Sequence, residues 1–78
     1  MELRVECYAG QRADERPQRF YLGTQRFDVE EVLDQWHSPE ATYFRVCAHD
    51  GNLYVLRHHE PQDYWTLESF RRQASQGG

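Results

Sequence analysis

The chain contains neither lysine nor isoleucine among its 78 residues. All nine basic residues are arginine, which the codon usage of a high-GC genome explains, so the missing lysines carry little functional meaning. The missing isoleucines matter for the fold, because leucine and valine together number only eleven and the aromatic residues also number eleven. A chain of this length forms one small domain at most, and we expect a small core built largely from aromatic rings.

Cysteine is scarce, and long apolar runs are absent. Cys7 and Cys47 are too few for a disulfide-stabilised scaffold, and we expect both to be free thiols. No apolar run approaches the roughly 18 residues that a membrane-spanning helix needs. The charged N-terminal residues do not resemble the apolar stretch of a signal peptide. These features predict a soluble, cytoplasmic protein without a membrane partner.

Positive charge is also in the minority. Thirteen acidic residues exceed the nine arginines, and the formal net charge is −4. Nonspecific affinity for nucleic acids comes from cationic side chains that neutralise phosphates. The net charge therefore disfavours a nucleic-acid partner, although a local arginine patch is compatible with it.

What the sequence does contain is strand alternation, with almost no helical periodicity. Residues 19–29 predict a hairpin with a two-residue type II′ turn, because Gly23 stands at the first central position and readily adopts a positive φ. That register places Phe20 opposite Phe27 on one apolar face and leaves the polar residues on the other face.

The alternation breaks at Glu30 and Glu31 and then resumes with Val32 and Trp36 on one face. Such a break predicts a bulge or bend, which small barrels need where a strand passes from one sheet to the other. A single helical turn over residues 29–36 is the alternative.

The second predicted hairpin joins Thr42–Ala48 to Leu53–His59. The Asp50-Gly51 dipeptide favours a two-residue type I′ turn. In that register Val46 faces Val55 on the core side of the sheet. A three-residue loop with a G1 bulge would shift every pair by one residue.

The last predicted element covers residues 64–70. It fits a closing strand with Trp65 and Leu67 inward, and it also tolerates a short helix. We expect a single small β domain over residues 1–72 and a disordered tail over residues 73–78. The predicted fold is all-β, with five or six short antiparallel strands that close into a small SH3-like barrel. A strongly bent open sheet is the alternative.

The alternating pattern also predicts which side chains are buried. The expected core residues are Val5, Phe20, Phe27, Val29, Val32, Trp36, Phe44, Val46, Val55 and Leu67.

Four histidines and two cysteines are the residues most typical of chemistry. His58 and His59 are neighbours on a predicted strand and point to opposite faces, so they cannot chelate one metal together. His37 and His49 lie in other segments. Cys47 and His58 are two pairing steps apart, which is too far for an activated nucleophile. We therefore expect no catalytic residue, no metal site and no cofactor.

The outward face of the second hairpin is the candidate binding surface. Its members are Tyr43, Arg45, Tyr54, Leu56 and His58. Tyrosine and arginine are enriched at protein-interface hot spots, and aromatic rings beside arginine can also stack on nucleic-acid bases. The structural alternative is that this face packs against the C-terminal segment through Trp65 or Phe70.

Parts of the chain resemble a family of short bacterial proteins of unknown function. The resemblance is carried by Tyr43-Phe44-Arg45-Val46, Asp50-Gly51-Asn52-Leu53-Tyr54-Val55-Leu56-Arg57-His58, Glu31-Val32-Leu33-Asp34-Gln35-Trp36 and Val5-Glu6-Cys7-Tyr8-Ala9-Gly10. It implies a small cytoplasmic β domain from a bacterium and no particular activity.

These observations predict a non-catalytic β module that binds an unidentified protein partner or serves as a structural accessory domain. A weak single-stranded nucleic-acid-binding module is the alternative. An enzyme or a metal-binding domain ranks third.

Overall fold

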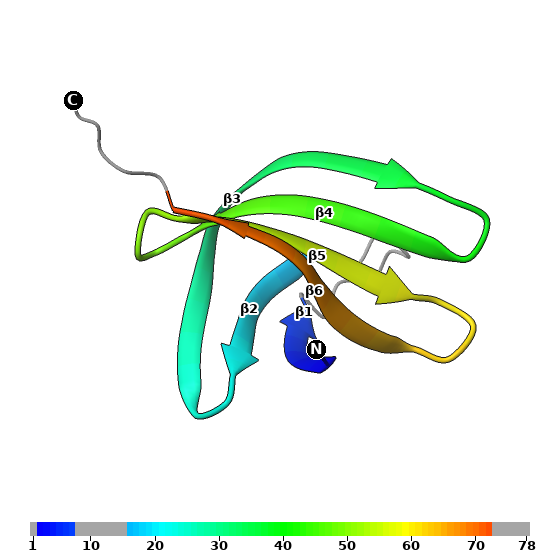
Figure 1. Cartoon of the computed structure of the whole chain (residues 1–78), viewed down its shortest axis with the longest axis horizontal. Coiled ribbons are helices and arrows are strands. Elements are labelled where there is room, and N and C mark those ends of the chain that lie inside the picture. Colours follow the sequence, from blue (N-terminus) through cyan, green and yellow to red (C-terminus); the bar gives the residue numbers. More distant parts are fainter. Residues whose placement is uncertain (1, 8–15, 73–78) are drawn as a thin grey trace.

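The computed structural model describes residues 2–7 and 16–72, which form six strands and no helix. The strands are β1 (Glu2–Cys7), β2 (Pro17–Leu22), β3 (Gln25–His37), β4 (Ala41–Ala48), β5 (Leu53–His59) and β6 (Tyr64–Arg71). Each strand pairs antiparallel with the next, and β1 also pairs with β6, so the sheet closes into a barrel (Figure 1). The predicted small all-β barrel is therefore confirmed.

The barrel closes through a short contact between its first and last strands. Glu2 lies opposite Thr66 and Leu3 lies opposite Trp65. The closing element is a strand over residues 64–71, so the alternative of a short helix there is wrong. Among the described residues, no helix is long and apolar enough to cross a membrane. The tail predicted to be disordered, residues 73–78, lies outside the described residues.

The first hairpin has the predicted register. Phe20 lies opposite Phe27, and Leu22 lies opposite Gln25. Gly23 has a φ of 63°, which suits the first central position of a type II′ turn. The apolar alternation was enough to predict this pairing, because a slip of one residue would have exposed both phenylalanines.

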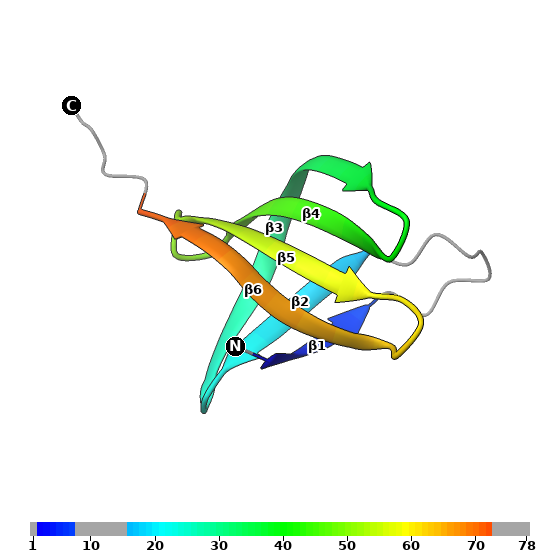
Figure 2. The same cartoon turned by 45° about the vertical axis from the view of Figure 1, so that its right-hand side comes forward.

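The long strand β3 carries the bend of the barrel (Figure 2). Its residues 25–28 pair with β2, whereas residues 29–37 pair with β4. Two bulges, at Glu30 and at Leu33, interrupt the pairing with β4. The predicted break in this strand is confirmed, and the alternative helical turn is wrong.

The second bulge decides the position of Trp36. Alternation from Val32 predicts that Trp36 faces the core, but the extra residue Leu33 moves it to the opposite face of the sheet. Trp36 lies opposite Tyr43 and is 40% exposed. The prediction of a buried Trp36 is therefore wrong.

Between β4 and β5, the loop has three residues, 49–51, between the hydrogen-bonded residues Ala48 and Asn52, instead of the predicted two. The Gly51 N–H donates to the Ala48 carbonyl at 2.8 Å, and the Ala48 N–H donates to the Asn52 carbonyl at 3.1 Å. Gly51 has a φ of 84°, the left-handed conformation that a G1 bulge requires. The predicted two-residue turn is therefore wrong. The pairing of β4 with β5 is the one expected for the alternative three-residue loop, in which every pair is shifted by one residue.

Compared with the predicted pairing, this shift exchanges the inner and outer faces of β5. Tyr54 lies opposite Val46, and Leu56 lies opposite the buried Phe44. Val55 instead lies opposite the exposed Arg45 and is only half-buried. The prediction of a buried Val55 is therefore wrong, since successive residues of a strand point to opposite faces.

The core is built largely from rings, as the composition predicts. Phe20 is fully buried, stacks on Phe27 at 5.2 Å between centroids and meets the edge of the Tyr54 ring at 5.0 Å. The buried apolar residues are Leu3, Phe20, Phe27, Ala41, Phe44, Val46, Ala48, Tyr54, Leu56 and Trp65. Of the predicted core, Val5, Val29, Val32 and Leu67 are partly buried against this cluster.

Two substitutions on β5 test the register. We expect Leu56→Ala to lower the free energy of unfolding by about 2–5 kcal/mol, because Leu56 is fully buried. Val55→Ala should cost less than half as much, because Val55 lies on the outside of the barrel. Urea unfolding of both variants measures the difference. A larger loss for Val55→Ala would show that the two-residue turn is the correct one.

Candidate functional site

The structure separates the five predicted binding residues. Tyr43 and Arg45 lie on the outside of β4, opposite Arg57 and Val55 of β5. Tyr54 and Leu56 lie in the core and are 3% and 0% exposed. The predicted surface therefore does not exist as one face, and the three-residue loop before β5 is the physical reason.

His58, the fifth member, points inward at one end of the barrel. Its ring stacks on Trp65 at 4.3 Å between centroids, with 11° between the planes. Its Nε2 lies 2.9 Å from Oδ1 of Asp63, and its side chain is 14% exposed. His58 is thus a packing residue at the barrel end, away from Tyr43 and Arg45.

A different surface brings chemically informative side chains together. We call it the outer face, meaning the side of strands β3 to β6 that points away from the core. The pairing of these strands places the following residues on it: Asp34, Trp36, Tyr43, Arg45, Leu53, Val55, Arg57, Ser69 and Arg71.

Three planar groups on this face are stacked across adjacent strands. The Trp36 and Tyr43 rings are 5.3 Å apart between centroids and within 2° of parallel. The Arg57 guanidinium carbon lies 5.4 Å from the centroid of the Tyr43 ring. We call this arrangement of Arg57 on β5, Tyr43 on β4 and Trp36 on β3 the ladder. Its order follows the order of the strands in the sheet.

Arg57 also forms an ion pair with Glu68 on the neighbouring strand β6. Its Nη1 lies 3.7 Å from Oε2 of Glu68, and its side chain is 29% exposed. Among the residues that the structure describes, its buried Nε has no hydrogen-bond partner. Arg57 and Trp36 were not among the predicted binding residues. Of the sequence signals, only the alternative of a three-residue loop between β4 and β5 placed Arg57 on the outside of the sheet.

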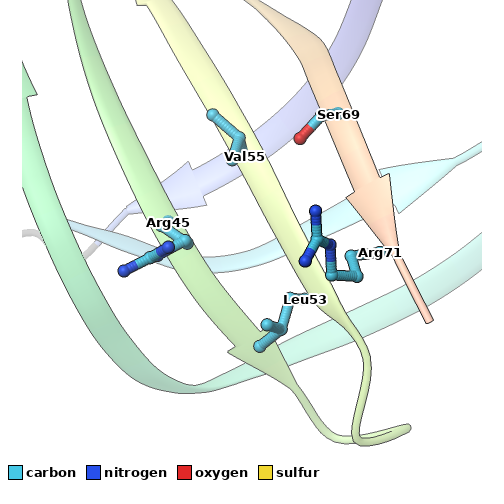
Figure 3. Close-up of a pocket in the computed structure, with 5 residues that line it drawn as sticks. All are labelled: Arg45, Leu53, Val55, Ser69 and Arg71. Atoms are coloured by element: carbon cyan, nitrogen blue, oxygen red, sulfur yellow. The ribbon is translucent and has the colours of Figure 1, made fainter. Parts of the chain in front are cut away.

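A shallow cavity of about 180 Å³ lies beside the ladder (Figure 3). Its lining residues are Arg45, Leu53, Val55, Ser69 and Arg71. The Arg45 guanidinium points away from Arg71 and toward β3, where its Nη2 lies 3.6 Å from Oδ2 of Asp34. Arg45 is thus partly neutralised, and the cavity is not a closed anion site.

One buried hydroxyl lies between a histidine and a carboxylate. Thr42 is 3% exposed, its Oγ1 lies 3.1 Å from Nδ1 of His37, and it donates a hydrogen bond to the Glu60 carboxylate. Because the hydroxyl proton goes to Glu60, His37 must be the donor in its contact with Thr42. His37 therefore does not act as a base toward this hydroxyl, and the arrangement ties β3, β4 and the turn after β5 together.

As predicted, Cys7 and Cys47 do not take part in a disulfide bond. Burial, together with the negative charges of Glu30 and Glu31, raises the pKa of the Cys47 thiol. A raised pKa favours the protonated thiol, which is the less nucleophilic form. Cys47 therefore lacks the environment of a catalytic cysteine.

The described residues offer little else for chemistry. No group of three or more histidine, cysteine, aspartate or glutamate side chains among them could hold a metal ion. A second cavity, between the start of β2 and the bend of β3, is lined by Arg16, Pro17, Val29, Glu30, Glu31 and Val32. No histidine or cysteine of residues 2–7 and 16–72 lines this cavity or the one beside the ladder.

The buried Tyr54 has an ionisation that can be measured. Its hydroxyl donates to the Asp50 carboxylate at 2.7 Å. Burial, followed by this hydrogen bond and by the Asp50 charge, raises the pKa of Tyr54 to about 12. The hydroxyl thus remains protonated well above the pH at which an exposed tyrosine ionises.

Stability should consequently fall at alkaline pH. Tyr54 is neutral in both states below its unfolded pKa of about 10, and above that value only the unfolded chain ionises until the folded pKa is reached. We expect the free energy of unfolding to decrease between about pH 10 and pH 12. Tyr54→Phe should show a smaller decrease over the same interval in urea unfolding. An equal decrease in both proteins would contradict the assignment.

The chain was compared with protein-family models, curated proteins and solved structures, and none of them matches it. The resemblance to a family of short bacterial proteins therefore stays a prediction.

Proposed function

We propose that the chain is a non-catalytic protein-binding module that engages its partner through the outer face. The observation that carries the proposal is the exposed Trp36 ring, which is stacked on Tyr43 and backed by Arg57. Tryptophan, tyrosine and arginine are the residue types most enriched among interface hot spots.

The ladder suits binding because its side chains are already ordered. Tyr43 lies between two planar neighbours, and Arg57 is further fixed by Glu68. Ordering a flexible side chain at an interface costs free energy, and side chains held in place beforehand avoid part of that cost. The half-buried Leu53 and Val55 beside the ladder add apolar surface.

The charges of the outer face favour a protein over a single-stranded nucleic acid. An exposed tryptophan can stack on a base, but two of the three arginines of the outer face are paired with acids, Arg45 with Asp34 and Arg57 with Glu68. The third, Arg71, forms no ion pair among the described residues. A phosphate would have to compete with these carboxylates, and the chain as a whole carries a formal charge of −4. Two cysteines that form no disulfide bond are in keeping with a cytoplasmic location in a bacterium.

Site-specific crosslinking tests the proposal. Photoreactive p-benzoylphenylalanine in place of Trp36 should form covalent adducts with protein when the labelled chain is irradiated in a lysate of its host cells. The matched control carries the same group in place of Tyr21. This residue lies on β2, away from the outer face, and the guanidinium carbon of Arg4 lies 5.3 Å from the centroid of its ring. We expect protein adducts at position 36 and none at position 21, as resolved by gel electrophoresis.

Two outcomes would contradict the proposal. Equal adduct formation at both positions would mean that the outer face has no special affinity for protein. Salt-sensitive binding of a labelled oligothymidylate that is lost in Trp36→Ala would favour the nucleic-acid alternative. Trp36→Ala should keep the fold, because Trp36 lies outside the core, and the lost stacking on Tyr43 should cost about 0.5–1.5 kcal/mol.

A further inference from the structure

Within the described part of the chain, one edge of the sheet remains open although the barrel is closed. Residues 25–28 of β3 have β2 on one side, whereas residues 34–37 pair with β4 and with no other strand among the described residues. In Figure 1 this part of β3 is the outermost strand at the top of the molecule. An exposed strand edge presents unpaired backbone groups that an extended chain can join.

The hydrogen-bond pattern identifies those backbone groups. Ser38 and Ala41 exchange hydrogen bonds between their backbones at 2.8 and 3.4 Å. Because such pairs alternate along an antiparallel ladder, Asp34 and Trp36 bond to β4, while Gln35 and His37 direct their N–H and C=O groups to the open edge. The Gln35 N–H indeed donates to the carboxylate of Asp34 at 2.9 Å and not to β4.

The ladder ends at this same edge. One face of the Trp36 ring is occupied by Tyr43, so the other face points beyond β3, away from β4. Strands in a sheet lie about 4.8 Å apart, close to the 5.3 Å between the two rings. A side chain on a strand added to β3 would therefore meet the open face of Trp36 as the next member of the ladder.

The acidic side chains near the open edge of β3 favour a positively charged side chain at the position beside Trp36. Glu30, Glu31 and Asp34 are exposed on β3, and within the described ranges Glu30 and Glu31 form no ion pair. Arginine and lysine are attracted both to carboxylates and to the face of an indole ring. The formal charge of −4 on the whole chain would steer a basic partner toward it.

We propose that residues 34–37 of β3 bind an extended basic segment of a partner protein as an added antiparallel strand. An arginine or lysine of that segment stacks on the open face of Trp36, and its backbone pairs with Gln35 and His37. The entering carbonyl replaces Oδ1 of Asp34 at the Gln35 N–H, and this oxygen, which is not the one paired with Arg45, then faces the cation. This inference rests on the proposed protein-binding function and names the edge and the class of partner.

Synthetic octapeptides test the charge preference. The probes are amidated peptides with four Arg-Thr repeats or four Glu-Thr repeats, capped with fluorescein at the N-terminus and titrated at about 150 mM salt to screen nonspecific attraction. We expect the arginine peptide to bind at least about tenfold more tightly than the glutamate peptide in fluorescence anisotropy. Trp36→Ala should weaken the arginine peptide about two- to fivefold, the size of an exposed cation–π contact. Tyr21→Ala is the matched control and should leave binding unchanged.

Backbone methylation tests the strand pairing itself. When arginine lies opposite Trp36, the threonines lie opposite Gln35 and His37, so in an antiparallel pair only the threonine N–H groups bond to β3. N-methylation of the threonines should abolish binding, whereas N-methylation of the arginines should leave it intact. On the protein side, Gln35→Pro removes an edge N–H that does not bond to β4, and Gln35→Thr keeps it. Binding should be lost only in Gln35→Pro.

The outcomes separate this inference from the proposed function. Equal binding of the unmodified and both methylated peptides would overturn strand addition, and loss confined to the arginine-methylated peptide would overturn the antiparallel pairing. Failure of all the peptides, together with protein adducts at position 36, would overturn the inference and leave the protein-binding function standing. Failure of the peptides together with an absence of adducts would overturn both.

Discussion

The positive φ of Gly51 is the constraint on which the arrangement of both faces depends. It permits a three-residue loop with a G1 bulge, and that loop sets the pairing of β4 with β5. Tyr54 and Leu56 consequently enter the core, and Arg57 is turned outward against Tyr43. A loop one residue shorter would exchange the inner and outer faces of β5.

The two bulges of β3 determine which of its side chains lie on the outer face, just as the loop between β4 and β5 determines which side chains of β5 lie in the core. The bulge at Glu30 lets one strand leave β2 and join β4, and the bulge at Leu33 turns Trp36 outward beside Tyr43. The ladder therefore depends on two separate irregularities, one in β3 and one between β4 and β5. Because the same strand extends beyond its pairing with β2, the ladder ends at an open edge, where an added strand would reach Trp36.

How much could be predicted depended on how strongly each segment fixed its own register. The first hairpin was predicted correctly because Gly23 and the apolar pair Phe20 and Phe27 all require the same pairing. The candidate site was predicted poorly, since both faces of β5 carry apolar and polar residues and neither face is excluded by alternation alone. Only Tyr43 and Arg45 of the five predicted residues lie on the outer face.

The sequence by itself determined the fold class, the break in β3 and a core made of rings. These follow from local alternation, turn residues and composition, which act over a few residues. The tertiary structure alone decided which side of β5 is buried, where Trp36 points and which edge stays open. Those features depend on a one-residue difference in a loop and on bulges in β3, and a shift of one residue exchanges the two faces of a strand.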